Sequence, residues 1–195
     1  MKTEDIQELR NFIDKIQPLS DVVWNDFASD WQFIETKRKT ILTAAGETER
    51  YVYFVLDGVQ RAYYLGENER EATIVFTYAP SFSGVADSAL TQLPSHYYFE
   101  TLTASSFLRL RVERLFELMK THREVQDMIM RATSLTLYGV LFRQAEIQAF
   151  SSEEKFKTLL KRSPHLLQLI PHKYIASYLG IDPTNFSKLL ANVSI

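Results

Sequence analysis

The residues of this sequence best suited to chemistry are four polar side chains near its C-terminus: Thr184, Asn185, Ser187 and Lys188. A carboxamide can pair with an adenine edge, a threonine can meet a thymine methyl or a base edge, and a lysine can reach a guanine or a phosphate. His172 and Lys173 precede them and suit contacts with backbone phosphates. Together these residue types predict a surface that contacts DNA.

The segment 170–190, IPHKYIASYLGIDPTNFSKLL, predicts the two short helices that would position these side chains. Pro171 suits a first helical turn, and Gly180 can adopt the left-handed conformation that ends a helix. Asp182 then caps the second helix and Pro183 takes its first position. Two helices joined by a three-residue turn that contains Gly form a helix-turn-helix. The alternative is a structural appendage of two helices whose polar residues face water.

Charge is divided unevenly along the chain. The net charge is -2, but residues 151–195 contain six basic and three acidic residues, a net charge of +3. The remaining 16 basic and 21 acidic residues give the first 150 residues a net charge of -5. The cationic part of the chain is therefore the part predicted to contact DNA, although a charge of +3 also fits an ordinary solvated surface.

Several classes of protein are disfavoured by what the sequence lacks. There is no cysteine, which excludes disulfides, thiolate metal sites and a thiol nucleophile. The histidines His96, His122, His165 and His172 have no metal-ligand spacing, so we expect no metal site. No glycine-rich phosphate loop, Gly-x-Ser-x-Gly elbow or His-Glu-x-x-His motif occurs, so we expect no enzymatic activity and no cofactor. The charged N-terminus and the absence of a long apolar run predict a cytoplasmic protein without a membrane span.

The predicted elements indicate an α+β fold. Apolar spacing predicts helices over 5–33, and residues 33–110 carry short runs typical of strands, broken by turn residues. Asp57-Gly58, between YVYFVL and VQRAYYL, predicts a tight hairpin turn. Strands of this length and spacing predict an antiparallel barrel or sandwich. A short helix is expected over 113–120.

A long helix is predicted from Glu124 to Phe150, a stretch without proline. One apolar seam follows it at steps of three, four and seven residues: Val125, Met128, Ala132, Leu135, Gly139, Phe142 and Ala149. A seam of this period favours homodimerisation, although it could also pack on the chain's own barrel. A second apolar row, with Ile129, Leu137, Val140, Leu141 and Ile147, favours one face for the barrel and another for a partner.

The chain resembles the cyclic-AMP receptor protein/Fnr superfamily of bacterial transcription regulators. The stretches that carry the resemblance are AAGE, YFVLDGVQRAYY, FSGVADSAL, LPSHYYFETLTASSFLRL and IPHKYIASYLGIDPTNFSKLL. The resemblance implies a jelly-roll barrel that senses a signal (1–120), a dimerisation helix (121–150) and a helix-turn-helix that binds double-stranded DNA (151–195). It also implies a homodimer, with RNA polymerase as a further partner.

The resemblance places the ligand-binding positions at Gly84, Val85, Ala86, Ser95, His96 and Arg61. In relatives that bind cyclic nucleotides, a Glu takes the ribose hydroxyl and an Arg neutralises the phosphate, but here those positions hold Val85 and Ser95. Charge-assisted hydrogen bonds contribute about 1.5–3 kcal/mol each, so we expect no tight binding of cyclic AMP. Arg61 or His96 could replace the Arg only by pointing inward, and we expect both at the surface. The small-molecule effector stays unidentified.

The DNA module departs from the family as well. The positions of the family's base-reading Arg, Glu and Arg hold Pro183, Thr184 and Lys188, and the sequence stops at Ile195, before a full β-hairpin wing. We therefore expect weak, salt-sensitive DNA binding per subunit. The sequence predicts a transcription regulator with an unidentified signal. The alternative is a sensor or protein-interaction module with a degenerate helix-turn-helix that does not bind DNA.

Overall fold

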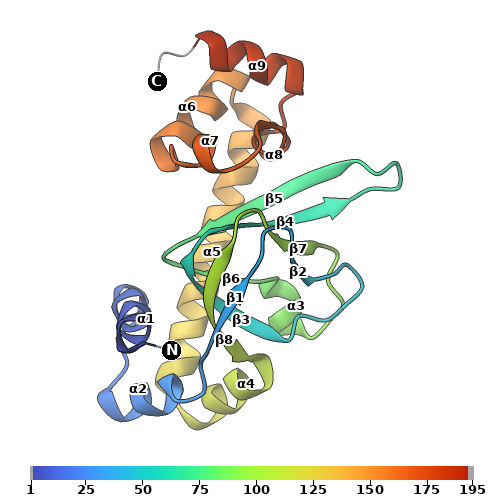
Figure 1. The fold of residues 1–195 in the computed structure, drawn as a ribbon. Helices are drawn as coiled ribbons and strands as arrows, with labels where there is room; N and C mark the ends of the chain where they lie inside the picture. The colour runs from blue at the N-terminus through green and yellow to red at the C-terminus, as the bar shows by residue number, and fades with distance from the viewer. Residues whose placement is uncertain (1, 193–195) are drawn as a thin grey trace.

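The computed structural model describes residues 2–192 and has the predicted α+β fold (Figure 1). Two helices open the chain, α1 (Thr3–Ile16) and α2 (Asp21–Ala28). Strands fill the middle of the chain and are followed by α4 (Val112–Thr121), α5 (Arg123–Ala149), α6 (Ser152–Arg162), α7 (Leu166–Leu169), α8 (His172–Leu179) and α9 (Pro183–Asn192). The long helix and the two helices of the helix-turn-helix are confirmed as secondary structure.

Within residues 2–192, the strands form two antiparallel sheets of four. Sheet A has the order β1 (Gln32–Thr36), β8 (Ser105–Arg111), β3 (Tyr51–Asp57) and β6 (Ser81–Ser83). Sheet B has the order β2 (Ile41–Thr43), β7 (Tyr98–Thr101), β4 (Val59–Leu65) and β5 (Glu71–Tyr78). Apart from β4 and β5, which pair as neighbours within sheet B, successive strands alternate between the sheets in the manner of a jelly roll. Within the described residues the two sheets do not pair with each other, so we call this unit the β-sandwich and not a closed barrel.

The turn at Asp57-Gly58 corrects the prediction of a hairpin. It joins β3 in sheet A to β4 in sheet B, and these two strands do not pair with each other. Gly58 has a φ of 89°, and a Cβ there would lie 2.3 Å from the Ser105 hydroxyl oxygen. The turn therefore packs closely against β8 and sends the chain across the β-sandwich, which a local turn signal cannot reveal.

Three apolar clusters hold the elements together. The first joins the outer face of sheet A to α1, α2, α4 and the start of α5, through residues such as Phe27, Phe54 and Leu108. The second lies between the sheets and contains Tyr53 and Phe99. The third joins sheet B to the C-terminal helices. Each sheet is thus covered on its outer face by helices.

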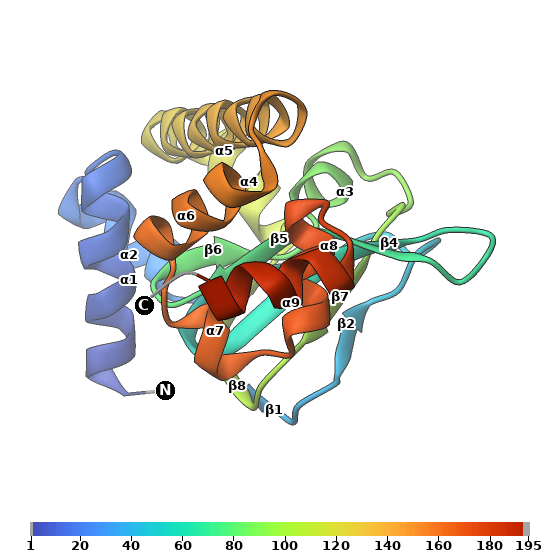
Figure 2. The same cartoon turned by 90° about the horizontal axis from the view of Figure 1, so that it is seen from above.

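Helix α5 runs the length of the molecule, from α4 at one end to the C-terminal helices at the other (Figure 1). In the view from above, α5 lies at the edge of the molecule, with the remaining elements to one side of it (Figure 2). No helix within residues 2–192 is long and apolar enough to cross a membrane.

Candidate DNA-binding and signal-sensing sites

The C-terminal helices form the predicted helix-turn-helix. Helix α8 ends at Gly180, which has a left-handed φ of 63°. The Asp182 carboxylate accepts the Thr184 N–H at 2.9 Å and so caps α9, whose first residue is Pro183. The predicted end of α8 at Gly180 and the predicted cap of α9 by Asp182 are therefore both confirmed. The chain turns between the helices in three residues, Gly180 to Asp182.

The polar face of α9 is exposed. Thr184, Asn185, Ser187 and Lys188 are all solvent-exposed, whereas Phe186 is buried against α6 by an edge-on contact with Phe156. Asn185 Nδ2 lies 3.4 Å from the Ser152 hydroxyl oxygen, and the Ser187 hydroxyl donates to the Pro183 carbonyl at 3.0 Å. The structure thus brings the four predicted side chains onto one outer surface. The Ser187 hydroxyl is engaged within its own helix.

His172 and Lys173 lie at the start of α8 and are also exposed. The His172 Nε2 atom lies 3.2 Å from the Leu167 carbonyl oxygen, and Lys173 Nζ lies 4.8 Å from the centre of the Tyr174 ring. Their cationic or donor groups remain at the surface. A wing would begin beyond α9, where residues 193–195 lie outside the described residues.

The predicted dimerisation seam is corrected at its first two residues. Val125 and Met128 are each 0% exposed, because they pack on α1, α2 and α4 in the first apolar cluster. Ala132 is half-buried, and Leu135, Gly139, Phe142 and Ala149 are exposed. One end of the seam therefore packs on the chain itself, which was the alternative interpretation.

A different face of α5 is uncovered, and we call it the α5 stripe: Met130, Leu137, Tyr138 and Leu141. These side chains are 57–71% exposed. Three of them fall at steps of seven and four residues, which places them on one side of a helix, and Tyr138 lies beside them. Leu137 and Leu141 belong to the second apolar row predicted from the sequence, and Leu135 and Phe142 of the first seam are also exposed, so both rows contribute to the free apolar surface of α5.

The ligand-binding segment expected from the family lies between β6 and α3 (Ala86–Thr91). Gly84 has a φ of 112°, and a Cβ there would meet Tyr53 at 3.3 Å. Val85 is buried, Ala86 is exposed, and His96 is exposed as expected. The Ser95 side chain is buried and bonds to the backbone N–H and carbonyl of Tyr97. The Ser95 side chain therefore stabilises the local turn between Ser95 and Tyr97.

Glu49 is a residue of this site that sequence analysis missed. Its carboxylate is buried and accepts the Thr43 hydroxyl at 2.6 Å and the Val85 N–H at 3.2 Å. It also accepts the N–H groups of Arg50 and Tyr51. Burial raises the pKa of Glu49, and these hydrogen bonds partly offset the rise. The Glu49 carboxylate thus already accepts the Val85 N–H that precedes α3. The sequence around Glu49, AAGETER, contains no motif that predicts this role.

The space between the sheets is filled by side chains. Tyr53, Val55, Phe99 and Phe107 are each no more than 2% exposed, and the Tyr53 ring lies 5.5–5.7 Å from the rings of Phe99 and Phe107. Burial, followed by the nearby charge of Glu49, raises the pKa of the Tyr53 hydroxyl well above its usual value. These residues form a packed core between the sheets.

The prediction that Arg61 lies at the surface is wrong, because this residue is 1% exposed. Its guanidinium donates to Glu100 and Glu71, each at 2.6 Å, and lies between the rings of Tyr63 and Tyr174, 4.0 and 3.8 Å from their centres. Arg61 is on the outer face of sheet B, and Tyr174 is on α8. Burial therefore results from the C-terminal helices, not from a ligand pocket inside the β-sandwich.

The interface between the β-sandwich and the C-terminal helices contains further specific contacts. The Ser177 hydroxyl accepts the Thr73 N–H at 2.9 Å. Phe76 packs on Tyr178, whose ring also faces the Arg143 guanidinium at 4.1 Å. Arg143 in turn pairs with the buried Glu146 of α5 at 2.9 Å. The sandwich, α5 and α8 are thereby tied together around a few polar groups.

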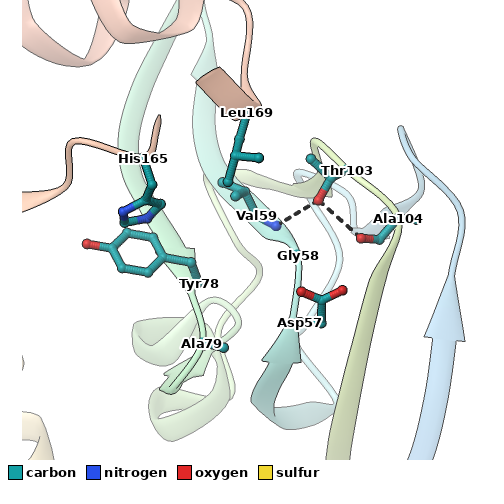
Figure 3. Close-up of a pocket in the computed structure, with 9 residues that line it drawn as sticks. All are labelled: Asp57, Gly58, Val59, Tyr78, Ala79, Thr103, Ala104, His165 and Leu169. Atoms are coloured by element: carbon teal, nitrogen blue, oxygen red, sulfur yellow. Dashed lines mark hydrogen bonds between the residues drawn. The ribbon is translucent and has the colours of Figure 1, made fainter. Parts of the chain in front are cut away.

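A cleft of about 520 Å³ opens beside this interface (Figure 3). The β3–β4 turn, the end of β5 and the loop before β8 form one wall, and α7 with the preceding His165 forms the other. The rings of His165 and Tyr78 meet edge to face at 4.4 Å between centres. Asp57 and Leu169 also line the cleft. The cleft has the size of a small-molecule site, and its two walls belong to the β-sandwich and to the C-terminal helices.

Comparison with known proteins agrees with this architecture. A family model for the cyclic nucleotide-binding domain matches residues 33–122. No curated protein matches the sequence. FixK2 from Bradyrhizobium japonicum superposes with a TM-score of 0.74 at 16% identity, covering 83% of each chain. A protein assigned to the crp/fnr family of transcriptional regulators, from Eubacterium rectale, gives 0.70 at 16% identity, covering 89% of this chain and 82% of that one.

The regulator CLP of Xanthomonas campestris, described as c-di-GMP responsive, gives a TM-score of 0.63 at 13% identity and covers 88% of this chain and 90% of its own. At these identities the likeness establishes the fold. It extends beyond the β-sandwich, because each of these matches covers more than four-fifths of the chain. Residues 33–122 therefore match the cyclic nucleotide-binding domain model, and the chain has the same overall fold as these solved structures.

Proposed function

We propose that this protein is a DNA-binding transcription regulator that acts as a homodimer and responds to a small molecule other than cyclic AMP. In this proposal residues 1–120 sense the signal, 121–150 dimerise and 151–195 bind DNA in the cytoplasm, with RNA polymerase as a further partner. The observation that carries the proposal is the polar face of α9, which is exposed on a capped helix-turn-helix. Helices held in this way insert their first turns into the major groove.

The α5 stripe supports a second copy as the partner. Between residues 135 and 142, α5 exposes Leu135, Leu137, Tyr138, Val140, Leu141 and Phe142, each by more than half. A helix segment that is apolar on most of its sides is normally covered. Spacing of seven and four residues suits a second, identical helix. A dimer would also present two copies of α9, so that two weak half-site contacts act together.

The Glu49 carboxylate supports an effector other than cyclic AMP. A cyclic phosphate bound at the start of α3 would lie near this buried anion, and Val85 and Ser95 offer it no counter-charge. Like charges in a buried site repel strongly. The cleft beside α7 is a suitable place for an effector, because its walls belong to the β-sandwich and to the C-terminal helices.

The rival proposal is a protein-interaction module that has lost DNA binding. It draws support from the absence of arginine in α9 and from the Asn185 amide, which lies within hydrogen-bonding distance of Ser152. The two proposals differ in what the polar residues of α9 do, so substitution of those residues separates them.

Lys188→Ala and Asn185→Ala test DNA binding. We expect Asn185→Ala to weaken binding to the selected sequence by about 1–3 kcal/mol, and Lys188→Ala to weaken binding to every sequence and to lower the salt slope by about one. Fluorescence anisotropy with labelled duplexes measures both. Lys15→Ala on α1 removes the same charge far from α9 and should bind DNA as the wild type does. Equal affinities for all four proteins would favour the protein-interaction module.

Leu137→Glu combined with Leu141→Glu tests the dimer. Two carboxylates on the α5 stripe would be buried without partners in the dimer, so we expect the wild type to sediment as a dimer and this variant as a monomer at micromolar concentration. Analytical ultracentrifugation measures the mass. Thr136→Glu, on the same helix but off the stripe, is the control and should stay dimeric. A monomeric wild type would remove the proposed mechanism.

Isothermal titration with cyclic AMP tests the proposed effector class. Because the Glu49 carboxylate already accepts the Val85 N–H and no arginine replaces the family's counter-charge, we expect no saturable heat up to about 1 mM ligand, which corresponds to a binding free energy weaker than about -4 kcal/mol. A dissociation constant in the micromolar range would contradict this part of the proposal.

A further inference from the structure

Two arginines of β8 lie over the same aromatic ring. The guanidinium carbons of Arg109 and Arg111 are 4.4 and 5.8 Å from the centre of the Tyr51 ring. The two residues are two apart on the strand, so their side chains leave the same face of sheet A. The shared ring therefore brings two positive charges close together, where they repel each other.

Neither arginine is neutralised by the protein. Among residues 2–192, no carboxylate forms a salt bridge with Arg109 or Arg111, although other arginines in this region are paired. The Arg109 side chain has one hydrogen bond, from Nη2 to the Gln32 side-chain oxygen at 3.4 Å. Its Nε is buried without a hydrogen-bond partner. Both guanidinium groups thus retain unused donors.

Asp30, which lines the same cavity as these arginines, is already engaged. Arg114 on α4 donates to Asp30 at 2.6 Å and to Asp26 at 2.5 Å. Asp30 is therefore neutralised and is not free to pair with Arg109 or Arg111. Paired in this way, Asp30 also repels an approaching anion less than a free carboxylate would.

These groups surround a cavity of about 240 Å³, lined by Asp30, Gln32, Arg109, Leu110, Arg111 and Arg114. It has three guanidinium groups and one carboxylate, and it is smaller than most pockets for drug-sized ligands. Two unpaired guanidinium groups offer planar arrays of N–H donors that match the oxygens of a phosphoryl group. The size and the charge of the cavity together fit a compact dianion.

We propose that Arg109, Arg111 and Gln32 form a binding site for a compact phosphoryl dianion. The site lies where β8 meets α4, at the ring of Tyr51, whose backbone N–H donates to Glu49, and it is remote from α9 (Figure 1). It does not depend on DNA binding, so it could exist even if the proposed function were wrong. A bound dianion would relieve the repulsion between Arg109 and Arg111 and would link β1 and β8 beside the junction with α4.

Isothermal titration with inorganic pyrophosphate at constant ionic strength tests the site. We expect one binding event per chain in the wild type. Arg111→Gln removes an exposed guanidinium and should weaken binding about tenfold or more, in keeping with the strength of charge-assisted hydrogen bonds. Arg38→Gln removes the same charge from an exposed turn and should leave the affinity unchanged. Far-UV circular dichroism verifies that each variant is folded.

Two further titrations test whether binding is specific to this site and to a phosphoryl group. Lys188→Ala should bind pyrophosphate as the wild type does, because the proposed site is remote from the DNA module. Succinate, a dicarboxylate, should bind more weakly than pyrophosphate. The proposal would be overturned by the absence of a saturable signal in the wild type, by equal affinities of the Arg111→Gln and Arg38→Gln variants, or by loss of binding in Lys188→Ala.

Discussion

The buried guanidinium of Arg61 is the interaction on which the arrangement of the molecule depends. A charge that is 1% exposed is costly unless it is paired, and Arg61 obtains two carboxylates from sheet B and one of its two aromatic faces from Tyr174 of α8. Moving α8 away would expose Arg61 to water and remove that contact. The same residue therefore stabilises the β-sandwich and fixes the position of α8 against it.

This contact gives the proposed regulator a route from signal to DNA. The cleft beside α7 is bounded by the β-sandwich on one side and by the C-terminal helices on the other, so a ligand there would favour one position of α8 over another. Helix α5 also contacts both units, through Val125 at one end and Arg143 at the other. A shift of the DNA module would thereby alter the spacing of the two α9 helices in a dimer.

Sequence analysis succeeded where neighbouring residues determine the structure. Gly180 and Asp182 fix the turn before α9 by local conformation and capping, and the stretch from Glu124 to Phe150 contains no proline that would interrupt a helix. It failed where distant segments determine burial. Tyr174 covers Arg61, and α1 and α2 cover Val125. The burial of these two residues therefore cannot be predicted from the residues next to them in the sequence. Glu49 was missed because its role depends on β2 and on Val85.

Selection from a random pool of duplex DNA by the purified wild-type protein, repeated at several salt concentrations, tests the central claim most directly. The account predicts enrichment of a two-fold-symmetric sequence, since a dimer presents two identical α9 helices, and affinity that falls steeply as salt rises. Failure to enrich any sequence at low salt, together with a flat response to salt, would contradict it and would favour a module that binds another protein.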